Sequence, residues 1–160
     1  GEECVTAIEA INITQEENFR NKSLKIEKIV SERCKKLITK YGNQVKECKG
    51  KGSLHGIFLK TNTRFGKILS VLPVNLTKDK KFLPKLMAAA ISDWLFEKYK
   101  IYVLFSTTEN VALLFAPSLV IDEKEIHYFF DSLESAFEKG IWKIVAKFSS
   151  KQFSQNVNFD

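Results

Sequence analysis

Residues 45–59 read VKECKGKGSLHGIFL, in which two short strand-like segments flank a glycine-rich break. The first segment ends before the glycines and the second begins after them, so we predict one strand at 45–48 and another at 54–59. Gly50, Lys51 and Gly52 separate them, and glycine permits the positive φ angles that a tight turn needs. The stretch therefore predicts an antiparallel pair of strands.

Two helices are expected before these strands. Val5, Ile8 and Ile11 recur at helical spacing, and a polar break follows at 15–17. From Ser23 onward apolar side chains recur every three or four residues up to position 41, where Gly42 is a natural stop. We therefore predict a short amphipathic helix followed by a long one.

The chain after the first two strands alternates again between helix and strand. Residues 64–81 are weakly patterned and are treated as an irregular insertion that carries at most one edge strand. The elements predicted after it are a helix at 83–99, and strands at 101–105 and 111–115 joined by a polar loop.

A last strong helix is predicted to begin at Asp122, because Glu125 three positions on completes a capping-box pair. Gly140 ends it, and Ile141, Val145 and Phe148 suggest one further short helix. The final residues, 149–160, are expected to form a polar tail.

This order of elements predicts the fold class α+β. The expected architecture is a two-layer sandwich, with a small, mostly antiparallel sheet covered on one face by helices. The 160 residues, 44% of them hydrophobic, match the size and core content of one domain, so 1–160 is expected to be a single domain.

The formal net charge of +6 permits an acidic partner without requiring one. Lysines crowd at 35–51 and 60–85, whereas carboxylates gather near the start of the chain and at 122–138. Blocks of one sign usually lie on exposed faces, so a solvated, asymmetric surface is favoured over a binding patch.

The three cysteines are an odd number without C-x-x-C spacing, which argues against a zinc site and predicts buried, reduced thiols. The sequence has no apolar run of about 18 residues and no basic-then-apolar opening. Neither a membrane span nor a signal peptide is therefore expected, and the expected location is the cytoplasm.

No residue pattern in the chain indicates catalysis. Gly50, Gly52 and Gly56 have the wrong spacing for a phosphate-binding loop and precede a strand instead of a helix. His55 is expected on a strand, facing solvent or a neighbouring domain, and His127 at a polar helix position. No catalytic, cofactor-binding or metal-binding residue is assigned.

Two segments, in order, resemble the C-terminal part of class III aminotransferases, a group of fold-type I enzymes. Residues 45–59 resemble the family's V-R-G-x-G-L-x-x-G-I-E-L pattern, with Lys49 where arginine is usual. Residues 111–122, VALLFAPSLVID, are similar to the strand that leads into P-P-L-x-I-T/D, with Ser118 in place of the second proline. The two opening helices also resemble the family, so the likeness spans about 3–140.

The resemblance implies a small domain that forms one wall of a substrate cleft. In that family pyridoxal phosphate, its Schiff-base lysine and its phosphate-binding groups belong to a large domain that precedes this region in the same polypeptide. The parent enzyme is then expected to be a homodimer that uses pyridoxal phosphate. The isolated chain is expected to bind no cofactor and to be inactive.

Leu114 is the candidate residue of the substrate cleft. Family members that act on α-amino or 2-oxo acids commonly carry an arginine three residues before the first proline of P-P-L, where it clamps the substrate carboxylate. Here that position holds Leu114, which cannot make a bidentate, charge-assisted pair. The departure predicts a substrate whose nearby end is uncharged or apolar, unless Leu114 simply faces the core.

One alternative function remains open from the sequence. The chain would then be a free-standing α+β binding module, with a basic surface for nucleic acid or protein.

Overall fold

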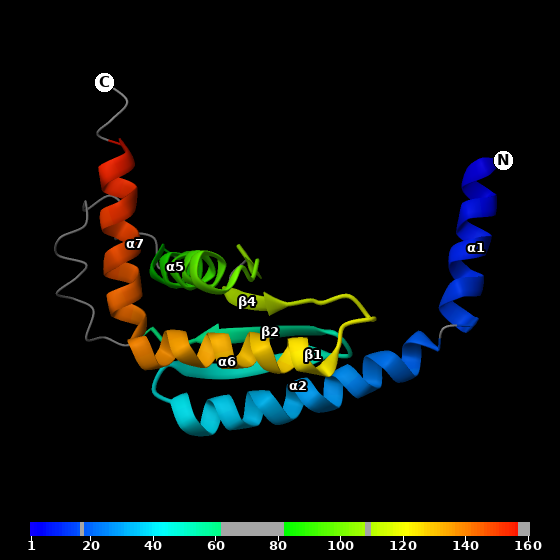
Figure 1. Ribbon diagram of the computed structural model, residues 1–160, viewed down its shortest axis with the longest axis horizontal. Helices are drawn as coiled ribbons and strands as arrows, with labels where there is room; N and C mark the ends of the chain where they lie inside the picture. Colours follow the sequence, from blue (N-terminus) through cyan, green and yellow to red (C-terminus); the bar gives the residue numbers. More distant parts are fainter. Residues whose placement is uncertain (17, 62–81, 108–109, 157–160) are drawn as a thin grey trace.

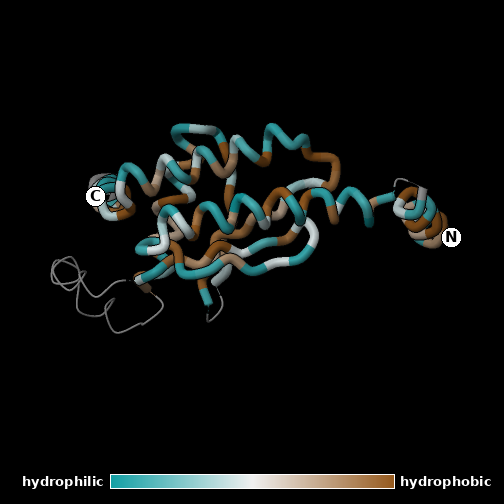
Figure 2. The backbone as a smooth tube through the Cα atoms, turned by 90° about the horizontal axis from the view of Figure 1, so that it is seen from below, coloured by the Kyte–Doolittle hydropathy of each residue, from teal (hydrophilic) through white to brown (hydrophobic). Residues whose placement is uncertain are grey.

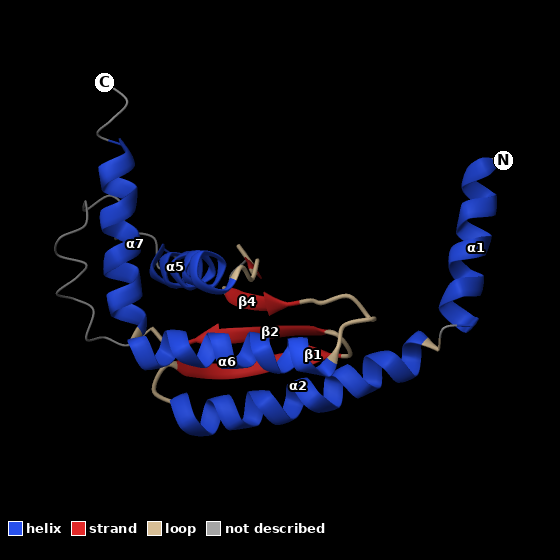
Figure 3. Ribbon diagram, viewed as in Figure 1, coloured by secondary structure: helices blue, strands red, loops and turns tan. Residues whose placement is uncertain are grey.

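A computed structural model describes residues 1–16, 18–61, 82–107 and 110–156 of the chain. The predicted insertion at 64–81 lies outside these residues. The described part has five helices and a small sheet, and Figures 1 and 3 show their arrangement. The helices are α1 (Glu2–Glu16), α2 (Phe19–Tyr41), α5 (Phe82–Tyr99), α6 (Glu123–Lys139) and α7 (Ile141–Asn156). The strands are β1 (Val45–Lys51), β2 (Leu54–Leu59), β3 (Leu104–Phe105) and β4 (Ala112–Phe115).

The four strands form one antiparallel sheet in the order β1-β2-β4-β3. Lys51 pairs with Leu54, so β1 runs three residues further than predicted and only Gly52 and Ser53 form the turn. Gly52 has a φ of 59°, which is the left-handed conformation that glycine adopts without strain. The predicted hairpin is confirmed, with a tighter turn than the glycine-rich break suggested.

One face of the sheet carries the core. Successive strand residues point to opposite faces, and the register aligns Cys48, Ile57 and Leu113 across the sheet on one of them. Ile57 and Leu113 are fully buried in a single cluster with side chains of α2, α5 and α6. Helices α2 and α6 lie side by side along the sheet (Figure 1). The predicted α+β sandwich with helices on one face is confirmed.

The two terminal helices project from opposite ends of this body (Figures 1 and 2). In α1 the predicted apolar stripe is present, but Val5, Ile8 and Ile11 are each more than half exposed. In Figure 2 the tube of this N-terminal helix carries hydrophobic colouring and stands apart from the rest. Helix α7 instead packs against α5 and α6, and buries Ile141, Ile144 and Val145.

Besides the end of β1, three further predicted boundaries are wrong by several residues. Helix α2 begins at Phe19, one turn before the predicted start at Ser23. Strand β3 spans only Leu104–Phe105 instead of 101–105. The polar tail predicted at 149–160 is helical as far as Asn156, because Lys151 pairs with two carboxylates of α5 and fastens this part of α7.

The prediction that the cysteines are buried is confirmed for one of the three, Cys34. Cys34 is buried, Cys48 is half-buried and Cys4 is exposed on α1. The correction at Cys4 has a simple cause, since α1 makes few contacts with the other described elements. Over the described ranges, no helix is both long enough and apolar enough to span a bilayer.

Candidate functional site

A pocket of about 630 Å³ opens beside the β3–β4 edge of the sheet. Its wall combines three parts of the chain: the segment leading into β3, the end of β4 with the loop that follows, and one side of α6. The pocket is lined by, among others, Tyr102, Leu104, Leu114, Pro117, Val120 and Tyr128.

Strand alternation explains why apolar side chains remain available for this pocket. In β4, Leu113 and Phe115 point into the core, where Phe115 stacks on Phe129 and Phe130 with ring centroids 4.7 and 5.8 Å apart. Leu114 lies between them and therefore points to the opposite face. It is half-buried, so the interpretation of Leu114 as a core-facing residue is wrong.

Leu114 belongs to a row of residues across the face of the sheet that the helices leave open. The register pairs Lys49 with Gly56, Gly56 with Leu114, and Leu114 with Leu104. Leu104 is 57% exposed, and Gly56, which has no side chain, leaves room for the ring of Phe58. The open face is therefore apolar at the pocket end and carries a lysine at the far edge.

The loop after β4 forms the second side of the pocket, and the start of α6 holds it in place. Asp122 precedes the helix, and its backbone N–H donates to the Glu125 carboxylate at 3.0 Å, as the predicted capping box requires. The Ile121 N–H donates to the Ser118 carbonyl at 3.1 Å, which folds the loop back on itself. Ser118, which replaces a proline of the family pattern, supplies part of this turn.

The chemistry of the pocket is that of a binding wall. Among the described residues, its lining holds no lysine, arginine or histidine, and the carboxylate there, Glu125, accepts the helix-capping hydrogen bond. Tyr128 donates its hydroxyl proton to the Tyr99 carbonyl at 3.2 Å. Tyr102 is 77% exposed at the rim. Such a surface can hold an apolar group away from water.

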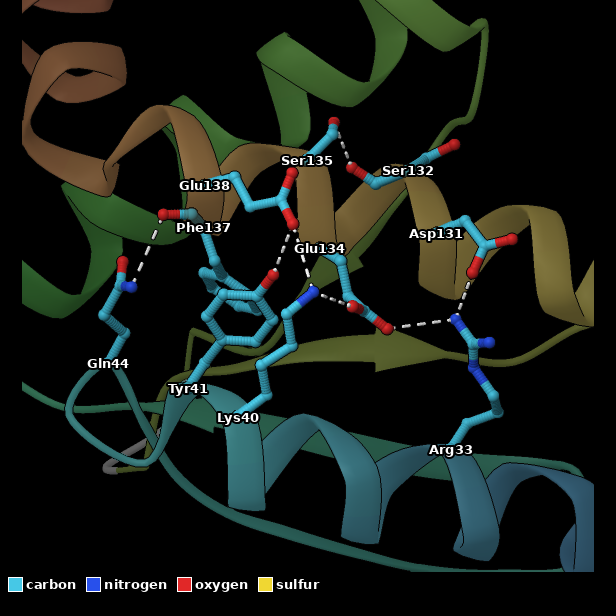
Figure 4. A network of polar contacts seen from close by, with 10 residues as sticks. All are labelled: Arg33, Lys40, Tyr41, Gln44, Asp131, Ser132, Glu134, Ser135, Phe137 and Glu138. Atoms are coloured by element: carbon cyan, nitrogen blue, oxygen red, sulfur yellow. Dashed lines mark hydrogen bonds and ion pairs between the residues drawn. The ribbon is translucent and has the colours of Figure 1, made fainter.

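A second cluster of charged groups joins α2 to α6, and Figure 4 shows it. Arg33 pairs with Asp131 and Glu134, while Lys40 lies 3.0 Å from Glu134 and 3.1 Å from Glu138. Lys40, and next Tyr41, donate hydrogen bonds to Glu138 and hold the pKa of this carboxyl below its ordinary value. Because each charge shown in the network has an opposite partner, the cluster is a structural link between helices.

The predicted position is confirmed for one of the two histidines and is wrong in part for the other. His127 lies on α6 with Nε2 3.5 Å from Glu123 Oε1, which confirms a polar helix position. His55 lies on β2 as predicted, but it is 4% exposed and donates from Nε2 to the Gly52 carbonyl at 3.0 Å. The prediction that it faces solvent or a neighbouring domain is wrong, because its strand register turns it toward the helix-covered face.

Two lysines of the described residues, Lys40 and Lys151, do not fit the role of a Schiff-base lysine. Such an amine needs a lowered pKa inside a desolvated pocket. Hydrogen bonds to Tyr41, Glu134 and Glu138 instead raise the pKa of Lys40, and a hydrogen bond to Glu97 raises that of Lys151. No step of pyridoxal phosphate chemistry is assigned to these side chains.

The sequence pattern missed Tyr102, Leu104 and Tyr128 as parts of one pocket. Alternation along 101–105 was a usable signal, since Val103 is buried while Tyr102 and Leu104 on either side are exposed. Tyr128 had no such signal, because it lies on the exposed side of α6 and reaches the pocket only through tertiary packing.

No protein-family model and no curated protein sequence matches the chain. Solved structures do match. A Bacillus anthracis aminotransferase is 24% identical with a TM-score of 0.62, over 85% of this chain and 28% of its own. The adenosylmethionine-8-amino-7-oxononanoate aminotransferase of Methanocaldococcus jannaschii is 28% identical with a TM-score of 0.58, over 85% and 27%. An amine transaminase from an uncultivated Pseudomonas species, solved with bound PLP, is 19% identical with a TM-score of 0.61, over 85% and 27%.

The chain thus spans less than a third of the length of each of these solved proteins. The resemblance to aminotransferases that the two sequence segments indicate is confirmed, and the chain has the fold of one part of these proteins.

Proposed function

We propose that this chain is the C-terminal small domain of a class III aminotransferase dependent on pyridoxal phosphate. The single observation that supports this most is the apolar pocket around Leu114, which lies within the second family-like segment and on an exposed wall. The fold likeness to aminotransferases over about a quarter of their length supports the same proposal. Residues 1–160 then act as one domain of a longer, cytoplasmic polypeptide whose parent is a homodimer.

In this proposal the chain contributes binding and the exclusion of water, and the preceding large domain contributes the cofactor and its lysine. Pyridoxal phosphate supplies the electron sink of the reaction when it is bound there. The pocket holds the apolar part of the substrate, and closure of the small domain against the large one removes water from the cleft. No residue of this chain is assigned a catalytic role.

Leu114 gives the proposed cleft a substrate preference. It lies in an apolar pocket with Leu104 across the strand pair and Pro117 and Val120 beside it. A carboxylate placed there would lose its hydration without gaining an arginine partner. The expected substrate therefore has an uncharged or apolar end at this position.

The experiment compares glutamate with a simple primary amine as amino donors for the full-length enzyme, before and after Leu114→Arg. We expect the unaltered enzyme to prefer the amine and the variant to gain activity toward glutamate, with a change of about tenfold or more in the kcat/KM ratio. Leu104→Arg, across the strand pair, is the matched control for an added charge that is not at the clamp position. An unaltered enzyme that prefers glutamate and does not respond to Leu114→Arg would contradict the assignment.

The alternative of a nucleic-acid-binding module receives no specific support from the described residues. The β1 lysines are exposed, but Lys46 and Lys49 lie beside Glu47, and Lys51 lies 3.5 Å from Glu27. These pairs reduce the positive field that a phosphate backbone would meet.

A further inference from the structure

Two cysteines from different elements meet in the layer between helix and sheet. Cys34 is on the buried stripe of α2, between Val30 and Leu37, and is 5% exposed. Cys48 is on β1, opposite Ile57, and packs half-buried against the same core. Their side chains hydrogen-bond to each other.

The connection between α2 and β1 explains why these two positions meet. Residues 42–44 form a short turn, with the Gln44 N–H donating to the Tyr41 carbonyl at 2.8 Å. Cys34 lies seven residues before Tyr41, which is about 10 Å along a helix. Cys48 lies three residues after Val45, which is about 10 Å along a strand. The two thiols therefore lie at about the same distance from the turn, one on α2 and the other on β1, where the helix packs against the strand.

We propose that Cys34 and Cys48 are a site of reversible oxidation, where a small disulfide such as oxidised glutathione converts the two thiols into a bond between α2 and β1. The cysteine pair lies at the β1 edge of the sheet, whereas the Leu114 pocket lies at the β3–β4 edge, because the strand order is β1-β2-β4-β3. The inference does not depend on the proposed aminotransferase function.

The reaction is two successive thiol–disulfide exchanges. The more accessible Cys48 thiolate attacks glutathione disulfide, forms a mixed disulfide and releases one glutathione thiolate. The Cys34 thiolate then attacks the Cys48 sulfur and releases the second. Two cysteine thiols are oxidised, one glutathione disulfide is reduced to two glutathione thiols, and the two cysteine protons go to the released glutathiones.

The order of the two exchanges follows from accessibility. In the reduced pair the hydrogen bond between the thiols lowers the pKa of Cys34, and the same hydrogen bond, and then burial, raises the pKa of Cys48. The first exchange, at the more accessible Cys48, is therefore the slow step. Once Cys48 carries glutathione, Cys34 is already beside it.

The test uses the 160-residue chain with Cys4→Ser, which removes the exposed thiol on α1. After incubation with oxidised glutathione, intact mass and peptide mapping should show the loss of two hydrogen atoms and a linked pair of peptides containing Cys34 and Cys48. Dithiothreitol should reverse both. The bond closes a loop of 15 residues, so the oxidised form should melt several degrees above the reduced form.

Cys34→Ser in the same background is the matched control, and should stop at one glutathione on Cys48. Should that variant fail to fold, the peptide map of the Cys4→Ser chain still decides the question. The proposal is overturned if Cys34 and Cys48 stay free, or each carry glutathione, under conditions in which Cys4 of the unaltered chain reacts fully. An oxidised form that melts below the reduced form would equally contradict a site built for this bond.

Discussion

Gly52, at the β1–β2 turn, has a backbone conformation that tolerates replacement poorly. Its φ is 59°, and a Cβ built there would overlap the Ser23 hydroxyl of α2. Gly52→Val should therefore lower the free energy of unfolding by about 1–3 kcal/mol, measured by urea denaturation.

The backbone strain can be separated from the contact with Ser23. In a Ser23→Ala background the clash is relieved, so Gly52→Asn should cost less than Gly52→Val because asparagine tolerates the left-handed region. Equal stability of Gly52→Val and the unaltered chain would show that the turn adopts another conformation in solution.

The Glu27 carboxylate of α2 accepts a hydrogen bond from the same turn, and this contact depends on pH because the carboxylate can be protonated. The Gly52 N–H donates to Glu27 at 2.8 Å and is the main reason that the pKa of Glu27 lies below 4.5, with Lys51 adding to the effect. A lowered folded-state pKa stabilises the fold above pH 4.5, and this stabilisation is lost as the pH falls through the folded value.

The expected result is a flatter dependence of stability on pH in Glu27→Gln than in the unaltered chain, between neutral pH and about pH 3. Glu32→Gln, at an exposed position of the same helix, is the control and should leave the slope unchanged. Parallel curves for the unaltered chain and Glu27→Gln would contradict the contribution of this hydrogen bond.

Among the described helices, α1 does not contribute side chains to the hydrophobic core. Its residues from Glu2 to Gln15 are all exposed, and it makes few contacts with the other described elements. Deletion of residues 1–16 should therefore change the melting temperature of the remainder by less than about 2 °C. Leu133→Ala, at a fully buried position of α6, is the contrast and should cost about 2–5 kcal/mol. A large fall in melting temperature on deletion would show that α1 packs against the body.

Local patterns predicted the elements with the strongest periodicity. The stripe of α6, with Ile126, Phe130 and Leu133, is buried as its spacing indicates. The failures arise where distant contacts decide the structure. Helix α7 continues past position 149 because it packs along α5, and no local signal in a polar sequence records that neighbour. Gly50 was assigned to the turn, yet it lies in a strand where a Cβ would press on the His55 ring at 2.5 Å.

The candidate site could be recognised only by combining the sequence resemblance with the tertiary structure. Leu114 was found from the resemblance alone, and the alternation of β4 turns it to the open face of the sheet. The pocket around it required the structure, because Tyr102, Val120 and Tyr128 are far apart in sequence and come together only when α6 packs beside β3 and β4.

In the proposed function the chain supplies a cleft wall to an enzyme whose cofactor lysine lies elsewhere in the polypeptide. Borohydride reduction with pyridoxal phosphate, followed by peptide mapping, tests this on the product of the natural gene and on the isolated 160-residue chain. We expect one lysine adduct per polypeptide, outside residues 1–160 and with transaminase turnover, and no stoichiometric adduct on the isolated chain. A single specific adduct on a lysine within residues 1–160, with turnover by the isolated chain, would contradict it.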